Sequence, residues 1–156
     1  MTRDRLREEE MTQSAPRTTI SDGFCVLLAD DHALMRQILR AILESYPKLS
    51  IIGEAANGME AVEMAAALKP DGIIMDVNMP KMDGIQATKQ IKAAQPAISV
   101  IGLSVIDDKH VTEAMKGAGA EAVLLKDELK KLDEAMRRWS ADALNQSSSC
   151  ETEFPD

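Results

Sequence analysis

Aromatic residues and long apolar runs are scarce in this chain of 156 residues, and acidic residues outnumber basic ones. Aromatics make up only 3% of a composition that is 45% hydrophobic, so we expect an aliphatic core rich in alanine and methionine. No apolar run approaches the length of a membrane span. The formal net charge of −8 argues against direct binding to nucleic acid or to an anionic membrane.

Cysteine is rare as well. The two cysteines are Cys25, in a predicted strand, and Cys150, in a polar segment near the end of the chain. Their placement argues against a disulfide between them, and neither stands at a spacing typical of metal ligands. Cysteine usage therefore indicates a reducing, cytoplasmic setting.

Three short apolar runs each end at charged residues. The run 25–29 is followed by Asp30 and Asp31, the run 72–75 by Asp76, and the run 122–125 by Lys126. Short, continuously apolar runs beside turn signals are typical of strands that are buried on both faces. Because the carboxyl ends of parallel strands meet in one crevice, we expect these four side chains to lie close together.

Predicted strands and helices alternate along the chain. Strands are expected over 24–29, 50–54, 72–76, 99–103 and 122–125, and helices over about 31–45, 58–68, 83–94, 107–118 and 127–144. Five such units predict an α/β fold with a doubly wound, flavodoxin-like parallel sheet of strand order 2-1-3-4-5. The polar segments 1–22 and 145–156 are predicted to be disordered, which leaves one domain over 23–144.

The expected crevice has the composition of a divalent-cation and phosphoryl site. Carboxylate oxygens suit Mg²⁺, which prefers oxygen ligands and keeps several waters. Asp76 could also act as a nucleophile that takes a phosphoryl group as an acyl phosphate. Lys126 would supply a positive charge, and Ser104, at the end of the fourth strand, would supply a hydroxyl donor.

The joint order of these motifs resembles the receiver domain of two-component response regulators, which has the CheY-like fold. The likeness covers about residues 23–142. The matching motifs are Leu-Leu-Ala-Asp30-Asp31-His32, Met-Asp76-Val-Asn78-Met79-Pro80-Lys-Met-Asp83-Gly84, Gly-Leu-Ser104 and Leu-Leu-Lys126-Asp127. Some of these phrases look like the subfamily that often precedes a LuxR-type DNA-binding domain.

The resemblance implies roles for the matching residues. Asp76 would accept a phosphoryl group from a phosphohistidine on a sensor histidine kinase or a histidine phosphotransfer domain. Asp31 and Asp76 would bind Mg²⁺ directly, Asp30 would bind it mainly through water, and Asn78 would bind it through its backbone carbonyl. Ser104 and Lys126 would hold the phosphoryl oxygens.

Three further positions bear on how such a receiver would work. His32 could be taken for a phosphorylated histidine or a metal ligand, but we expect it at the rim of the site. Val123 stands where many receivers carry a Tyr or Phe, which excludes a ring-flip readout. Val105 replaces the more usual Ala or Gly, and we expect it to narrow access to Asp76.

The expected function is that of a single-domain response regulator. It would not be an enzyme, beyond assisting its own phosphorylation and dephosphorylation, and it would signal through an unknown downstream protein or relay the phosphoryl group. The residues after the last predicted helix are too few for a helix-turn-helix. The helix over 31–45 is a candidate surface for the phosphodonor, and the last two helices are candidates for a homodimer.

Two other classes of function remain open. A phosphorylation-independent interaction module would fit the absence of a switch aromatic at Val123, although the full acidic set argues against it. An aspartate-dependent phosphatase would need a second acid two residues after its nucleophile, for general acid–base catalysis. That position is Asn78, which argues against a phosphatase.

Overall fold

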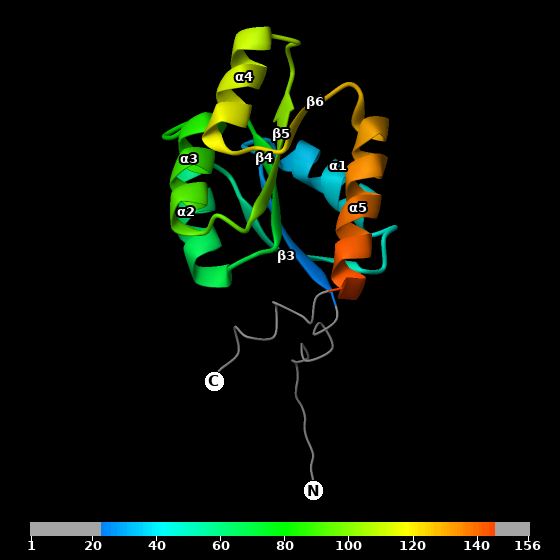
Figure 1. Ribbon diagram of the computed structural model, residues 1–156. Coiled ribbons are helices and arrows are strands. Elements are labelled where there is room, and N and C mark those ends of the chain that lie inside the picture. Colours follow the sequence, from blue (N-terminus) through cyan, green and yellow to red (C-terminus); the bar gives the residue numbers. More distant parts are fainter. Residues whose placement is uncertain (1–22, 146–156) are drawn as a thin grey trace, which may run out of the picture.

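One parallel sheet forms the centre of the computed structural model, which describes residues 23–145 (Figure 1). Its five strands are β2 (Phe24–Ala29), β3 (Leu49–Ala55), β4 (Gly72–Asp76), β5 (Ser99–Ser104) and β6 (Ala122–Leu125). They are hydrogen-bonded in the order β3-β2-β4-β5-β6, and every pair is parallel. This confirms the predicted fold class and the 2-1-3-4-5 order.

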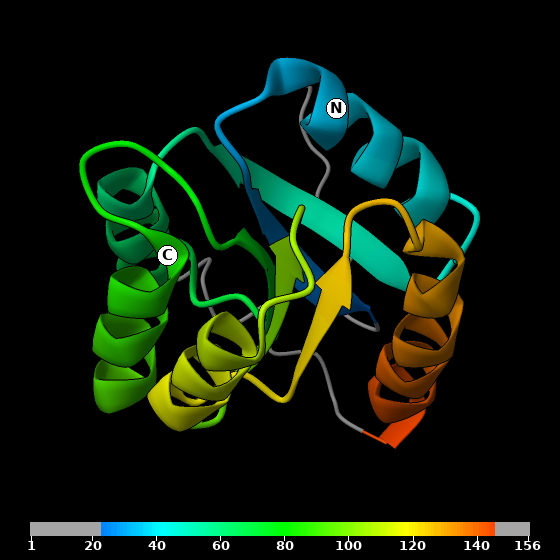
Figure 2. The ribbon, with the colours of Figure 1, turned by 90° about the horizontal axis from the view of Figure 1, so that it is seen from above.

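Helices cover both faces of the sheet. Figures 1 and 2 show α1 and α5 on one face and α2, α3 and α4 on the other. Their bounds are α1 Ala33–Leu43, α2 Gly58–Leu68, α3 Gly84–Ala94, α4 Lys109–Ala118 and α5 Leu132–Asn145, which a short 3₁₀ helix, η2 (Leu129–Lys131), precedes. Within the described part of the chain, no helix is long and apolar enough to span a membrane.

Alternation along β2 divides the interior into two cores. Val26 and Leu28 pack into the cluster shared with α1 and α5, whereas Leu27 and Ala29 pack into the cluster shared with α2, α3 and α4. This division follows because successive side chains of a strand point to opposite faces. Trp139 of α5 stacks on Phe24 at a centroid distance of 5.0 Å. The strands are thereby held as a stiff platform for the residues at their carboxyl ends.

Three helices begin later than the sequence predicts, and the first of them, α1, starts at Ala33, not near 31. α4 starts at Lys109, not near 107, because the side chain of Asp108 caps it by accepting hydrogen bonds from the backbone N–H groups of His110 and Val111. The last predicted helix, 127–144, starts instead as η2 and becomes α-helical at Leu132. The loops after β5 and β6 are therefore longer than predicted, and residues of both loops line the site.

Some expectations concern residues outside those that the structure describes. The predicted tails, 1–22 and 145–156, lie there apart from Asn145, which ends α5, and so does Cys150. Cys25 is buried in β2, and the expectation that it forms no disulfide with Cys150 depends on Cys150 and so lies outside the described residues.

Candidate functional site

Strand register brings the charged residues together at one edge of the sheet. Ala29 pairs with Met75, Asp76 with Leu103, and Ser104 with Leu125. The residues that end or follow these strands are therefore neighbours in space, although nearly 100 positions separate Asp30 from Lys126 in the sequence. The predicted meeting of Asp30, Asp76 and Lys126 is what the structure shows.

Lys126 bridges the two buried carboxylates. Its Nζ lies 2.9 Å from Oδ2 of Asp30 and 3.2 Å from Oδ1 of Asp76. The side chains of Asp30 and Asp76 are 0% and 3% exposed, and that of Lys126 is 14% exposed. Burial lowers the pKa of Lys126, but its hydrogen bonds to Asp30 and Asp76 and their charges outweigh burial and raise that pKa. Lys126 therefore stays cationic.

The surroundings of Asp76 disfavour ionisation of its carboxyl group. Burial, followed by the nearby charge of Asp30, raises the pKa of Asp76 to about 6, against the opposing effects of Lys126 and of the Asn78 backbone N–H. A single lysine does not neutralise the carboxylates that face it. The site therefore favours a further positive charge beside Asp76.

Asp31 and His32 stand at the outer rim of the same site. Nδ1 of His32 lies 3.1 Å from Oδ1 of Asp31 and 3.3 Å from Oδ1 of Asp30. One ligand atom from each of Asp30, Asp31, His32 and Asp76 falls in a group in which all separations are within 4.8 Å. The expectation that His32 lies at the rim is met, and the structure places it against both adjacent acids.

The donor set fits a divalent cation. Among the described residues, Oδ2 of Asp76 is buried and has no hydrogen-bond partner, and a buried carboxylate oxygen is costly to leave unpaired. The site also offers the oxygens of Asp31 and the one oxygen of Asp30 that does not face Lys126. Asn78 lies beside them, since its backbone N–H donates to Oδ1 of Asp76 at 3.3 Å.

Ser104 lies at this edge of the sheet, but its hydroxyl is engaged elsewhere. The hydroxyl donates to the carbonyl of Ile106 at 2.9 Å and accepts from the N–H of Ile106 at 3.2 Å. Within residues 23–145, no hydrogen bond joins Ser104 to the carboxylates. The side chain is 3% exposed, so a change of its χ1 rotamer would redirect it inside a closed environment.

The loop after β4 is fixed to Asp76 by two adjacent residues. Asp83 caps α3 by accepting a hydrogen bond from the N–H of Gln86 at 2.9 Å. A Cβ at Gly84 would stand 2.2 Å from the carbonyl oxygen of Asp76, so this position has room only for glycine. The Asp-Gly pair thus starts a helix directly against the backbone of the candidate phosphoacceptor.

Sequence reasoning missed a pair of arginines that hold the start of the site. Arg36 of α1 donates through Nη1 to the backbone carbonyl of Asp30 at 2.5 Å and through Nε to Glu54 at 2.9 Å. Arg40, one turn later, also binds Glu54, at 2.6 Å. The one available signal was the i,i+4 spacing of two arginines on a helix that otherwise presents apolar residues.

An apolar hollow of about 300 Å³ opens beside the site. Its lining comes from α1 and from the residues that follow β5 and β6, namely His32, Leu34, Met35, Ile38, Val105 and Lys126. Leu34 is 67% exposed and Val105 is 62% exposed. The neighbouring Ile106 is also exposed. Val123, in contrast, packs partly buried against the α2–α4 core.

Comparison with known proteins finds one family. The description "Response regulator receiver domain" matches residues 26–137. The transcriptional regulatory protein LiaR of Bacillus subtilis is 48% identical over 103 residues, which is 65% of this chain and 48% of LiaR. A protein-glutamate methylesterase/protein-glutamine glutaminase of Methanosarcina acetivorans is 43% identical over 97 residues, or 62% of this chain and 28% of that protein. The matched part thus spans about half, or less, of these relatives.

Solved structures agree with this result. The response regulator domain of Thermotoga maritima CheB superposes with a TM-score of 0.70 at 33% identity, covering 76% of this chain and 97% of that one. The receiver domain of the sensor histidine kinase PA1611 from Pseudomonas aeruginosa, solved with a magnesium ion in its active-site cleft, gives 0.67 at 27% identity, covering 76% and 98%. With its sheet order and its acidic site, this chain belongs to the response regulator receiver domain family.

Proposed function

We propose that this chain accepts a phosphoryl group on Asp76 from a phosphohistidine of a sensor histidine kinase or a histidine phosphotransfer domain. It then signals through a partner protein or relays the group to a second histidine. The observation that carries the proposal is the state of Asp76, a buried carboxylate held beside Lys126 and two further acids, with one oxygen that has no hydrogen-bond partner within residues 23–145. Burying charged carboxylates costs free energy of desolvation, and an interaction module that needs no phosphorylation would gain nothing in return.

The transfer needs positioning and charge neutralisation more than it needs covalent help. An oxygen of Asp76 attacks phosphorus, the P–N bond to the donor histidine breaks, and its electron pair returns to the imidazole. The product is an acyl phosphate on Asp76. Lys126 already contacts Asp76 and would follow a phosphoryl oxygen, while Ser104 would reach another after leaving Ile106.

Mg²⁺ is the cofactor that we assign to the site. Asp31 and Asp76 would bind it directly, Asp30 through water, and Asn78 through its backbone carbonyl; once bound, it would neutralise charge on the transferring group. The buried, unpaired oxygen of Asp76 supports this assignment. So does the magnesium ion in the cleft of the PA1611 receiver, whose fold this chain shares.

The apolar hollow is our candidate contact for the phosphodonor. A donor must bring its phosphohistidine within bonding distance of Asp76, so its flanking surface must cover the residues around Lys126. Leu34, Ile38 and Val105 line the hollow next to Lys126, and all three side chains are exposed. Apolar patches of this kind mark protein contacts on otherwise polar surfaces.

The remaining assignments concern the chain as a whole. We propose a receiver domain over 23–144 that acts in the cytoplasm. We also propose that it does not contact nucleic acid and that it is not an enzyme in its own right.

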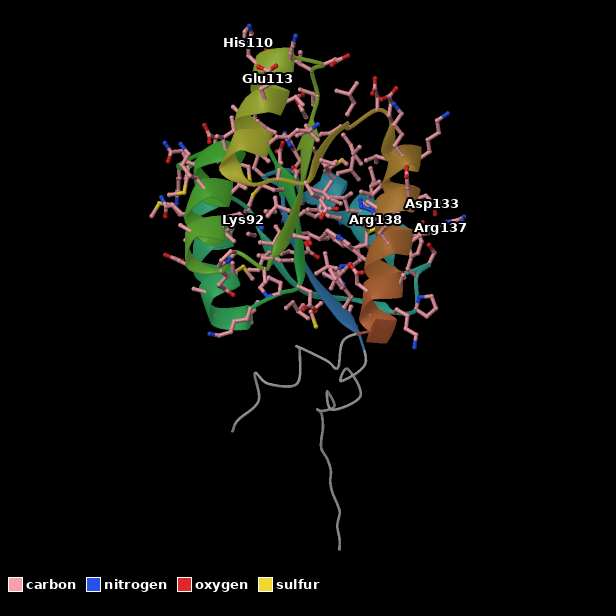
Figure 3. The ribbon with its side chains drawn as sticks, viewed as in Figure 1. Lys92, His110, Glu113, Asp133, Arg137 and Arg138 are labelled. Carbon is pink, nitrogen blue, oxygen red and sulfur yellow. The ribbon has the colours of Figure 1, made fainter. Side chains whose placement is uncertain are left out.

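A homodimer through α4 and α5 is an alternative output, supported by a hollow between β6 and α5 lined by Ala122, Leu124 and Arg138, among others. Figure 3 shows Arg137 on the outer side of α5, whereas Arg138 binds Glu121, which precedes β6, at 2.9 Å.

Intact-protein mass spectrometry would test phosphorylation. The protein is incubated with Mg²⁺ and acetyl phosphate, and then with a panel of phosphorylated histidine kinases, as wild type, Asp76→Asn and Asp107→Asn. Asp107 is an exposed loop aspartate and serves as the matched control. We expect one phosphate on wild type and Asp107→Asn and none on Asp76→Asn. If no donor in either set phosphorylates the wild type, the constitutive interaction module becomes the better explanation.

Donor docking needs a separate comparison. Leu34→Ser should slow phosphotransfer from a kinase while leaving phosphorylation by acetyl phosphate unchanged, because only the kinase uses the hollow. Met59→Ser removes a side chain that is 45% exposed on α2, across the sheet, and should change neither rate. If both variants slowed phosphotransfer from the kinase equally, the hollow would not be part of the docking surface.

A further inference from the structure

We propose that His32 adds a nitrogen ligand to the acidic cluster, so that the cluster also binds first-row transition-metal ions such as Ni²⁺ and Zn²⁺. The inference deepens the proposed function and rests on it, because both concern the same carboxylates. It differs in the ion and in the residue that selects the ion. Mg²⁺ would use the oxygens alone, and the softer ions would use the oxygens and the imidazole.

The distances suit a shared ion. Adjacent ligands of an octahedral ion with bonds of about 2.1 Å lie about 3 Å apart. Nδ1 of His32 lies 3.1 Å from an oxygen of Asp31 and 3.3 Å from one of Asp30. The group that these atoms form with Asp76 spans no more than 4.8 Å. Small side-chain rotations would therefore close the cluster around one ion.

Asp30 and Asp76 each keep one carboxylate oxygen that Lys126 does not contact and that could bind this ion. Lys126 takes Oδ2 of Asp30 and Oδ1 of Asp76. Oδ1 of Asp30 faces His32, and Oδ2 of Asp76 is buried and has no hydrogen-bond partner among the described residues. An ion bound by His32 would meet oxygens that the lysine does not occupy. It would also neutralise the carboxylate charge that Lys126 leaves unbalanced.

His32 directs its side chain at the acids of the site, where its Nδ1 lies within hydrogen-bonding distance, 3.3 Å, of Oδ1 of Asp30. It is the N-cap residue of α1, yet its side chain makes no capping hydrogen bond. Ser, Thr, Asp and Asn are the residues that cap well. Its backbone N–H donates to Oδ1 of Asp30 at 2.8 Å, which fixes the residue, while its side chain is 69% exposed. The ring is thus anchored at the site and open to an incoming ion.

The chemistry of the ligand decides which ions respond to it. Mg²⁺ is a hard ion bound through oxygen, whereas imidazole suits Ni²⁺ and Zn²⁺, and affinity rises along the first-row series toward copper. Removal of His32 should therefore weaken transition-metal binding and spare Mg²⁺. Because both classes of ion need the same carboxylates, each should compete with the other.

Isothermal titration calorimetry of tag-free protein tests the proposal, with Ni²⁺ and Mg²⁺ as separate probes. The variants are His32→Gln and, as the matched control, His110→Gln, which changes the histidine at the outer end of α4 (Figure 3). We expect His32→Gln to lower Ni²⁺ affinity by about tenfold or more and Mg²⁺ affinity by less than about twofold. His110→Gln should alter neither.

A second measurement identifies the ligand atom. In ¹⁵N NMR of the imidazole groups, Zn²⁺ should shift a ring nitrogen of His32 and not those of His110. Unchanged Ni²⁺ affinity in His32→Gln, or equal losses for Ni²⁺ and Mg²⁺, would overturn the inference. If Asp76 still takes a phosphoryl group in that case, the proposed function stands. Binding of Ni²⁺ through His32 in a protein that no donor phosphorylates would instead refute the proposed function alone.

Discussion

The buried charge of Asp76 predicts a stability difference that depends on pH. Without a metal ion, the native state holds this carboxylate beside Asp30 and away from water, which raises the pKa of Asp76 from 3.8 to about 6. Since the native state binds the proton more tightly than the unfolded chain does, ionisation of Asp76 destabilises the fold. This destabilisation is absent below about pH 4 and fully developed above about pH 6.

Its magnitude follows from the size of the pKa change. Each pKa unit corresponds to about 1.4 kcal/mol, so a change of about two units amounts to about 3 kcal/mol. Asp76→Asn keeps the shape of the side chain and removes the charge. The variant should therefore gain up to about 3 kcal/mol over wild type as pH rises from about 4 to above 6.

Urea unfolding monitored by far-UV circular dichroism measures this gain. Wild type and Asp76→Asn are compared in EDTA at several values between about pH 4.5 and pH 8, and only the difference in the free energy of unfolding is used. Pairwise comparison cancels groups that titrate equally in both proteins. Asp107→Asn, in an exposed loop, is the control and should show no comparable trend.

Mg²⁺ supplies the reciprocal check. At about pH 8 it should stabilise wild type more than Asp76→Asn, because it binds the native carboxylates and the variant lacks one of them. A difference in unfolding free energy that stays constant across the pH range would refute the reasoning. It would mean that water or a shift of Lys126 already compensates the buried charge.

Three further predictions concern the surroundings of Asp76. Val105→Ala should speed dephosphorylation, measured by loss of the phosphate mass from isolated protein, and an unchanged rate would contradict a shielding role. Glu54→Gln should destabilise the fold by about 1 kcal/mol at neutral pH. Hydrogen bonding from Arg40 lowers the pKa of Glu54, so the loss should shrink as pH falls below about 4.5, as followed by urea unfolding. Gly84→Ala should cost about 1–3 kcal/mol in the same assay, because its Cβ would meet the Asp76 carbonyl; full stability would show that the loop can move aside.

Much of the sheet could be predicted because its signals are local. The runs that became β2, β4 and β6 are continuously apolar and bounded by charges or turns, and their observed limits match the expected ones. The meeting of Asp30, Asp76 and Lys126 then followed from parallel strands sharing one edge. Helix starts were less certain, since Asp107 and Asp108 are equally plausible caps in sequence and only the second one caps.

The remaining details depend on contacts that a single sequence does not record. Arg36 reaches the backbone of Asp30 only because α1 lies across the sheet edge, and Glu54 joins it from a different strand. The sequence likewise placed Ser104 at the right strand end but could not show that its hydroxyl faces Ile106. A rotamer is chosen by neighbours, and those neighbours are known only after the chain has folded.

The hydroxyl of Ser104 has a single proton to donate. While that proton is bonded to the carbonyl of Ile106, it is not available to an oxygen at Asp76, so the turn over 104–106 and a ligand at the site are competitors for it. Competition of this kind is reciprocal. A protein that binds Val105 and Ile106 in their present conformation would lower the affinity of the site at Asp76 for its ligand. A ligand at Asp76 would in turn lower the affinity for that protein by the same factor.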